Sequence, residues 1–175
     1  MDKLDIVTDE SGNEVVLLPE IIFSNKQNIN WNDVEDYLGK YVGELIEIAE
    51  TRDIIYIGNK FPDEYGGSSY TRKTKGARAK AKANAAQGIR EMVEIATDKV
   101  YRENHKEKHS EDAHNGWFYY VTRFAIPLYN NEKKTGEYNV YSACLVVNHA
   151  ANGKMYLYDV VGIKKEARNP LKTIK

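Results

Sequence analysis

Three of the four histidines in this 175-residue sequence lie within one ten-residue stretch: His105, His109 and His114. An unperturbed imidazole titrates at about pH 6.5, so it can exchange a proton near neutral pH. Two such groups could act as the general base and the general acid of a cleavage reaction. The alternative interpretation is a solvated end of a helix, where the helix dipole favours histidine.

The same histidines also permit a metal interpretation. His105 and His109 are four residues apart, the spacing of two zinc ligands on one helix. An HExxH motif is absent, and Lys106 and Lys108 would oppose a bound cation. The single cysteine, Cys144, allows neither an internal disulfide nor a thiolate zinc cluster. We therefore expect no metal and no cofactor, with the two-histidine site as the open alternative.

A second candidate is an arginine inside an apolar strand. Alternation along this strand places Arg123 on the same face as Trp117 and Tyr119, with Tyr120 on the opposite face. If the face is covered, the arginine needs a partner. If it is open, the arginine and the two rings could clamp a phosphate and stack a base.

A basic run is the third candidate. Residues 70–82 hold six Lys or Arg and no acidic residue. Lys75, Arg78 and Lys82 are spaced to share one helical face, and small alanines between them would let a phosphate backbone approach. The cations expected to bind nucleic acid in this run are Arg72, Lys73, Lys75, Arg78 and Lys82. The alternative is a solvated surface stripe.

Charge is divided unevenly along the chain, although the net charge is only −1. Residues 1–66 hold 5 basic and 15 acidic side chains, a net of −10, whereas residues 67–175 hold 20 and 11, a net of +9. This asymmetry favours a polyanionic partner for the basic part. Alternatively, the acidic third folds back onto the basic remainder and neutralises it, or masks it until a partner arrives.

The composition, 42% apolar and 29% charged, is typical of a globular domain. No apolar run is long enough for a transmembrane helix, and the N-terminus lacks the apolar region of a secretory signal. We expect a cytoplasmic protein that does not bind a membrane.

The elements that position these candidates are read from apolar periodicity. We expect a hairpin from residues 4–7 and 15–18, a helix over 32–50 capped by Asn32, a short strand over 54–57, a loop over 59–69, and a long helical region over 75–104 interrupted at Gly88. Three antiparallel strands follow, over 117–128, 138–147 and 155–163, with a tight turn at Asn152-Gly153.

The predicted fold class is therefore α+β: two helices, the second long, packed on an antiparallel sheet that ends in a three-stranded meander, with a small N-terminal hairpin. The expected organisation is an N-terminal extension (1–30), one α+β domain (31–171) and a short tail (172–175).

Residues 54–171 resemble the barnase–EndoU–colicin–RelE (BECR)-like nuclease domains carried by phage and integrative-element proteins of Firmicutes. The most specific elements are the string from His109 to Trp117, the strand segment Arg123-Phe124-Ala125, and residues 156–166. The sequence departs from the resemblance at Tyr119, where related domains often carry an arginine.

The resemblance implies metal-independent RNA cleavage or descent from such an enzyme. His109 would take the proton from a ribose 2′-OH, and His105 or His114 would protonate the leaving 5′-oxygen, leaving a 2′,3′-cyclic phosphate. Arg123, with Lys106 or Lys108, would stabilise the charge that develops on phosphorus. Tyr120 and Tyr158 match active-site positions more weakly, and Tyr119 is expected on the RNA-binding surface.

The resemblance also implies a toxin or an accessory protein of a mobile element. Its expected partners are RNA, tRNA among the candidates, and a neutralising immunity or antitoxin protein. If it is a toxin, it would act in a bacterial cytoplasm. The alternative is a non-catalytic nucleic-acid- or protein-binding module on the same scaffold.

Overall fold

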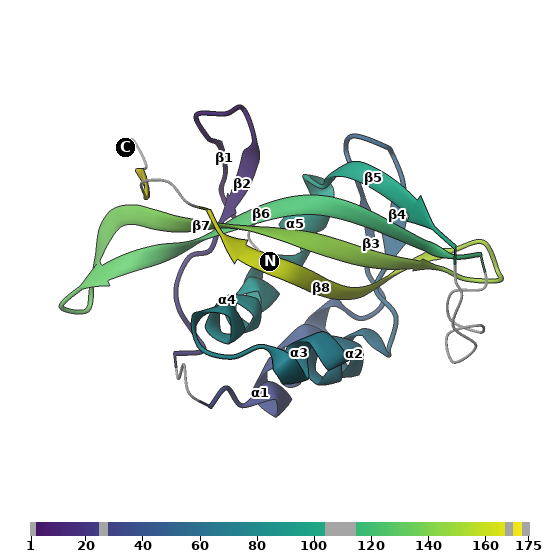
Figure 1. Ribbon diagram of the computed structural model, residues 1–175, viewed down its shortest axis with the longest axis horizontal. Helices are drawn as coiled ribbons and strands as arrows, with labels where there is room; N and C mark the ends of the chain where they lie inside the picture. The colour runs from purple at the N-terminus through teal and green to yellow at the C-terminus, as the bar shows by residue number, and fades with distance from the viewer. Residues whose placement is uncertain (1–2, 25–27, 104–114, 167–169, 173–175) are drawn as a thin grey trace.

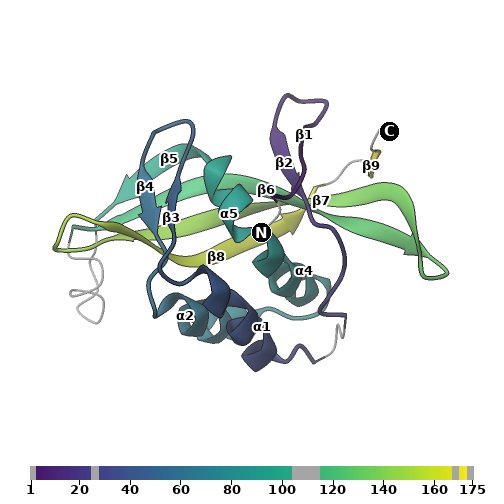
Figure 2. The same ribbon diagram turned by 180° about the vertical axis from the view of Figure 1, so that it is seen from behind.

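The computed structural model describes residues 3–24, 28–103, 115–166 and 170–172, which form an α+β protein with helices packed on a curled, mixed sheet (Figures 1 and 2). The strands within these residues are β1 (Ile6–Thr8), β2 (Glu14–Leu17), β3 (Leu45–Glu47), β4 (Ile54–Tyr56), β5 (Thr97–Arg102), β6 (Trp117–Asn130), β7 (Lys133–His149), β8 (Met155–Lys165) and β9 (Leu171–Lys172). The α-helices are α1 (Trp31–Leu38), α2 (Phe61–Gly67), α3 (Ser69–Lys73), α4 (Ala77–Ala85) and α5 (Ile89–Glu94). Single 3₁₀ turns, Gly39–Tyr41 and Ala86–Gly88, follow α1 and α4.

The long strands β6 and β7 form the centre of the sheet, whose order is β1-β2-β6-β7-β8-β4-β3. Along one edge of β6, β5 and β2 pair with different parts of the strand. Along one edge of β7, β8 and β9 do the same. The β2–β6 and β4–β8 pairs are parallel, and the other pairs are antiparallel. Irregularities in the register along β5, β6, β7 and β8 accompany the curl of the sheet.

The main core lies between the helices and one face of this sheet. Tyr120 and Phe124 of β6, Leu145 of β7 and Val160 of β8 pack there against the buried side of the helices. In Figure 2, α5 and the β3–β4 hairpin lie in front of the meander, whereas α1, α2 and α4 lie below it in both views. Val16 of the N-terminal hairpin belongs to the same core.

Two buried amides of the α4 region hold the extended segment that follows β2. Asn84 accepts hydrogen bonds from the backbone N–H of Ile22 and Phe23 and donates one to the carbonyl of Phe23, at 2.8, 3.1 and 2.8 Å. Gln87 donates to the carbonyl of Glu20 at 2.9 Å. These bonds satisfy backbone groups that no strand partner satisfies.

The structure confirms the α+β class, the N-terminal hairpin, the strand at residues 54–57 and the β6-β7-β8 meander with its turn at Asn152-Gly153. It contradicts the purely antiparallel sheet, because β2 and β4 join it in parallel.

Three predicted boundaries are wrong. The helix expected over 32–50 ends at Leu38. Beyond it Ile46 and Ile48 are buried and Leu45 is exposed, and this burial of every second residue belongs to a strand. Its N-cap is Asn30, whose side chain accepts from the N–H of Asn32 and Asp33. The helix expected to reach 104 ends at Glu94, and β5 follows along the edge of β6.

The loop expected over 59–69 contains α2 and the start of α3. Pro62 favours a loop in the sequence, but it stands in the first turn of α2, where its missing N–H costs nothing. Gly66 lies inside the same helix, and a Cβ there would collide with the side chain of Glu35. Among the described residues, no helix is both long and apolar enough to cross a membrane.

Candidate nucleic-acid interface

The cations of the basic run gather on α3, α4 and the turn between them. Arg72, Lys73, Lys75 and Arg78 are all exposed. The last three line a surface pocket together with Tyr70, Thr74 and Ala77. Within the described part of the chain, none of the four cations forms an ion pair with a carboxylate. As far as the described residues show, the surface presents positive charge without a paired carboxylate.

Local sequence signals build this surface. Ser68 caps α3 by accepting the N–H of Thr71 at 3.1 Å, and Thr74 closes the helix by donating its hydroxyl to the carbonyl of Tyr70 at 2.7 Å. Gly76 then begins α4 with φ +64° and ψ −135°, a conformation that is essentially restricted to glycine. The turn holds Lys75 and Arg78 next to each other on the same pocket.

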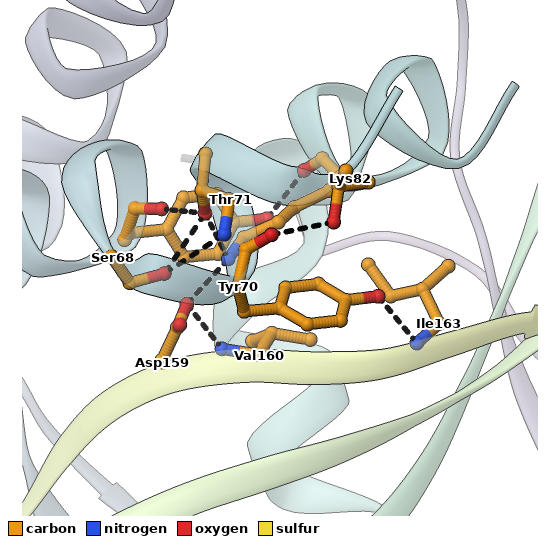
Figure 3. Close-up of polar contacts among 9 residues, drawn as sticks. Ser68, Tyr70, Thr71, Lys82, Asp159, Val160 and Ile163 are labelled. Atoms are coloured by element: carbon orange, nitrogen blue, oxygen red, sulfur yellow. Dashed lines mark hydrogen bonds and ion pairs between the residues drawn. The ribbon is translucent and has the colours of Figure 1, made fainter. Parts of the chain in front are cut away.

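Lys82 does not belong to that exposed surface, which corrects the prediction that it shares a phosphate-binding face with Lys75 and Arg78. Its side chain is 0% exposed. The Nζ atom donates to Asp159 Oδ1 at 2.5 Å and to Thr71 Oγ1 at 2.6 Å (Figure 3). It also lies 4.6 Å and 5.0 Å from the ring centroids of Tyr65 and Tyr70. Small neighbours on α4, alanines at 79, 81, 83, 85 and 86, bring this helix close enough to the sheet to bury the lysine.

The surroundings of Lys82 form a closed polar network. Thr71 donates its hydroxyl to the carbonyl of Tyr65 at 2.6 Å, and Tyr65 donates its own hydroxyl to the carbonyl of Lys82. Asp159 accepts the N–H of Val160 at 2.8 Å. The hydroxyl of Tyr70 accepts the N–H of Ile163 at 2.9 Å. The network therefore ties α2, α3 and α4 to β8, as Figure 3 shows.

Burial disfavours charge on both members of the ion pair: it lowers the pKa of Lys82 and raises the pKa of Asp159. Their mutual attraction and their hydrogen bonds oppose both shifts. Because the pair is closed to solvent, it supports the basic surface instead of contacting a ligand.

The acidic third does not neutralise this surface in the described part of the chain. Glu44 pairs with Arg90, and Asp53 pairs with Lys99 at 2.9 Å. Both contacts lie on other elements than α3 and the start of α4. The masking interpretation therefore finds no support among the described residues.

Arg123 and the aromatic residues of its strand face do not form one compact platform. Arg123 Nε pairs with Glu166 Oε1 at 2.9 Å. Trp117 packs edge-on against Tyr158, with ring centroids 5.1 Å apart, and Arg102 lies 5.9 Å from the ring of Tyr119. At about 3.3 Å per residue, the six residue steps from Trp117 to Arg123 span about 20 Å. The face therefore carries two separate clusters: the Arg123–Glu166 pair, and the aromatic contacts of Trp117 and Tyr119.

Tyr120 faces the opposite side, as the alternation predicts, and is buried. Its hydroxyl donates to Asp53 Oδ2 at 2.7 Å. Burial raises the pKa of Tyr120, and the negative charge of Asp53 raises it further. The hydroxyl is therefore committed to Asp53 and would not readily release a proton.

The predicted catalytic histidines, His105, His109 and His114, lie outside the described residues, as do Lys106 and Lys108. Asn115, the residue after His114 in the sequence, donates its N–H to the carbonyl of His149 and its side-chain amide to the carbonyl of Ala150, both at 2.8 Å. The described residues contain no group of three or more His, Cys, Asp or Glu placed to hold a metal ion.

Sequence reasoning missed Asp159, Thr71 and Ser68. A signal for Asp159 exists: it is an acidic residue inside an apolar strand, and such a residue needs a buried partner. Alanines on all sides of Lys82 likewise indicate a helix buried around its circumference. Thr71 and Ser68 carried no signal, because they fall at or beside the segment interpreted as a loop.

Comparison with protein-family models, with curated proteins and with solved structures finds no match to this chain.

Proposed function

We propose that this protein binds RNA through the surface of α3, α4 and the turn between them. The observation that carries the proposal is the group of four exposed cations, Arg72, Lys73, Lys75 and Arg78, without a carboxylate partner among the described residues. Clustered cations attract a phosphate backbone by releasing its counterions. The ring of Tyr70 beside them adds a surface on which a base can stack.

The test is fluorescence anisotropy with labelled single-stranded RNA and with tRNA, over a range of salt concentrations and with EDTA present. Each phosphate contact on a single strand contributes about 0.7 to the slope of log K against log salt. We expect Lys75→Gln/Arg78→Gln to reduce that slope by about 1.4.

The matched control is Lys133→Gln/Lys172→Gln, which removes the same charge from exposed positions on other elements. It should leave the slope unchanged apart from a small general effect. Equal slopes for the two double variants would contradict an interface on α3 and α4.

RNA cleavage without a metal is the enzymatic form of this proposal. It is supported by the BECR-like resemblance, with which the observed order of helices before a three-stranded meander agrees. In this form His109 is the base and His105 or His114 the acid, on RNA held by the basic surface. Arg123 is engaged by Glu166 and Tyr120 by Asp53, so neither is a preferred participant.

The binding mixtures also test cleavage when their RNA is subjected to end-group analysis. EDTA-resistant products with 2′,3′-cyclic phosphate ends, absent with His109→Ala, would establish the ribonuclease. Intact RNA that is still retained by the protein would leave a binding module.

A further inference from the structure

We propose that a pocket between α2 and the β7–β8 turn holds one unpaired nucleobase of the bound RNA, with adenine preferred, an inference that rests on the proposed RNA binding. The pocket has a volume of about 240 Å³ and is lined by residues 58–61, Glu64, Asn148, Ala150, Tyr156 and Leu157. Cavities for drug-sized ligands measure about 300–1,000 Å³. This pocket therefore suits one part of a larger ligand.

The feature that points to a ligand is the side chain of Asn148. It is only 6% exposed, and its Oδ1 atom is buried without a hydrogen-bond partner among the described residues. Such an acceptor loses its hydration without compensation unless a donor reaches it. A ligand group with an N–H or O–H would satisfy this acceptor, whereas a phosphate or carboxylate oxygen would not.

The wall of the pocket suits a flat ring. Tyr156 lines it, and Gly58 leaves room for that ring, because a Cβ at Gly58 would lie 3.3 Å from Tyr156 Cδ2. Tyr56 packs against Tyr156 with centroids 5.6 Å apart, and Lys154 Nζ lies 4.9 Å from the Tyr56 ring. A base stacked on Tyr156 would thus have a cation near its phosphate.

The amide of Asn148 favours adenine. A carboxamide offers one acceptor and one donor side by side, and this pair matches the N6 amino group and N7 of adenine. Adenine N6–H would supply the donor that Oδ1 lacks. A purine also gives Tyr156 more surface to stack on than a pyrimidine does.

The position of the pocket fits a strand that also contacts α3 and α4. Both pockets border β8: Leu157 lines the first, and Ile163 is bonded to Tyr70 of the second. The six residue steps from Leu157 to Ile163 correspond to about 20 Å along the strand. α2 and α3 follow each other directly in the chain and lie next to each other in Figure 1.

The experiment compares the affinities of labelled decamers of adenylate and of uridylate for the full chain, with EDTA present. We expect the wild-type protein to prefer the adenylate decamer about tenfold. Asn148→Leu, similar in size but without the amide, should remove this preference and leave uridylate binding within twofold. Asn130→Leu, an exposed asparagine at the far end of β6, is the matched control and should preserve it.

A second measurement does not depend on the folding of a variant. Adenosine monophosphate is titrated into the isotope-labelled wild-type protein, and the NMR signals of the Asn148 side-chain amide are followed. We expect these signals to shift with adenosine monophosphate and to move much less with uridine monophosphate.

The outcomes separate the two proposals. Equal binding of both decamers, with no shift at Asn148, overturns the base pocket while RNA binding by α3 and α4 stands. The proposed function itself is overturned if neither decamer binds and if Lys75→Gln/Arg78→Gln does not change the salt dependence of tRNA binding. A preference that persists in Asn148→Leu also overturns the pocket.

Discussion

Lys82 and Asp159 are buried, yet they position the residues of the basic surface. The hydrogen bonds of the buried pair join α3, α4 and β8. They fix the helices that display Lys75 and Arg78. Removing water from two charges is costly, and the geometry of the contacts must offset that cost. The pair therefore specifies how α4 sits on β8 more than it adds to stability.

This argument predicts an asymmetry between single and double substitutions. Lys82→Met leaves a buried, unpaired carboxylate and should destabilise the protein by about 3–5 kcal/mol. Lys82→Met/Asp159→Asn removes both charges and should recover much of that loss. Lys80→Met, two residues away and only half-buried, is the control and should cost far less.

Urea unfolding of the four proteins measures these differences. A loss below about 1 kcal/mol for Lys82→Met would indicate that the carboxylate finds water or another partner, contrary to the closed network.

At the scale of elements, the junction of α3 and α4 depends on one backbone conformation. Gly76 has φ +64° and ψ −135°, which a side chain would strain. Gly76→Ala should therefore cost about 1–3 kcal/mol and weaken RNA binding, because Lys75 and Arg78 would shift relative to each other. Unfolding and anisotropy measurements on the same variant test both effects.

Gly67→Ala is the matched control for this prediction. Gly67 ends α2, and a Cβ there meets no atom within 4 Å. Alanine should be tolerated or should stabilise the protein by up to about 1 kcal/mol. Similar losses in the two variants would show that the conformation of Gly76 is not the cause.

The elements also show what the sequence could and could not predict. Long alternating strands, such as those of the meander, were predictable because period-2 burial repeats many times in β6 and β7. Short elements were not: Leu45 and Ile48 have helical spacing, Ile46 and Ile48 have strand spacing, and the pairing of β3 with β4 decides between the two. The exposure of a lysine in an alanine-rich helix likewise depends on which strand covers it, as Lys82 demonstrates.

At the scale of the whole molecule, Asp53 connects the end of the β3–β4 turn to the long strands. It accepts hydrogen bonds from Thr51 and Tyr120 and pairs with Lys99. Burial opposes ionisation of its carboxyl, but the bonds from Lys99, Tyr120 and Thr51 outweigh burial and lower its pKa. A folded pKa below the unfolded value stabilises the folded state wherever the carboxylate is ionised.

The contribution of Asp53 to stability should therefore be complete above about pH 4, near the unfolded pKa, and disappear as the pH falls through the folded pKa. Unfolding free energies of the wild type and Asp53→Asn at pH 6, 4 and 3 measure it. The difference between them should be largest at pH 6 and shrink at pH 3. A constant difference between the wild type and Asp53→Asn at the three pH values would contradict the prediction.

The two parallel pairs of the sheet have a consequence for the newly made chain. Val16 pairs with Phe124, and Ile55 pairs with Met155, so both early hairpins depend on strands made about a hundred residues later. At about 5–20 residues per second, a ribosome needs about 5–20 s to supply those strands. During that interval the apolar faces of both hairpins are uncovered, which makes them the segments of the nascent chain that a chaperone would bind.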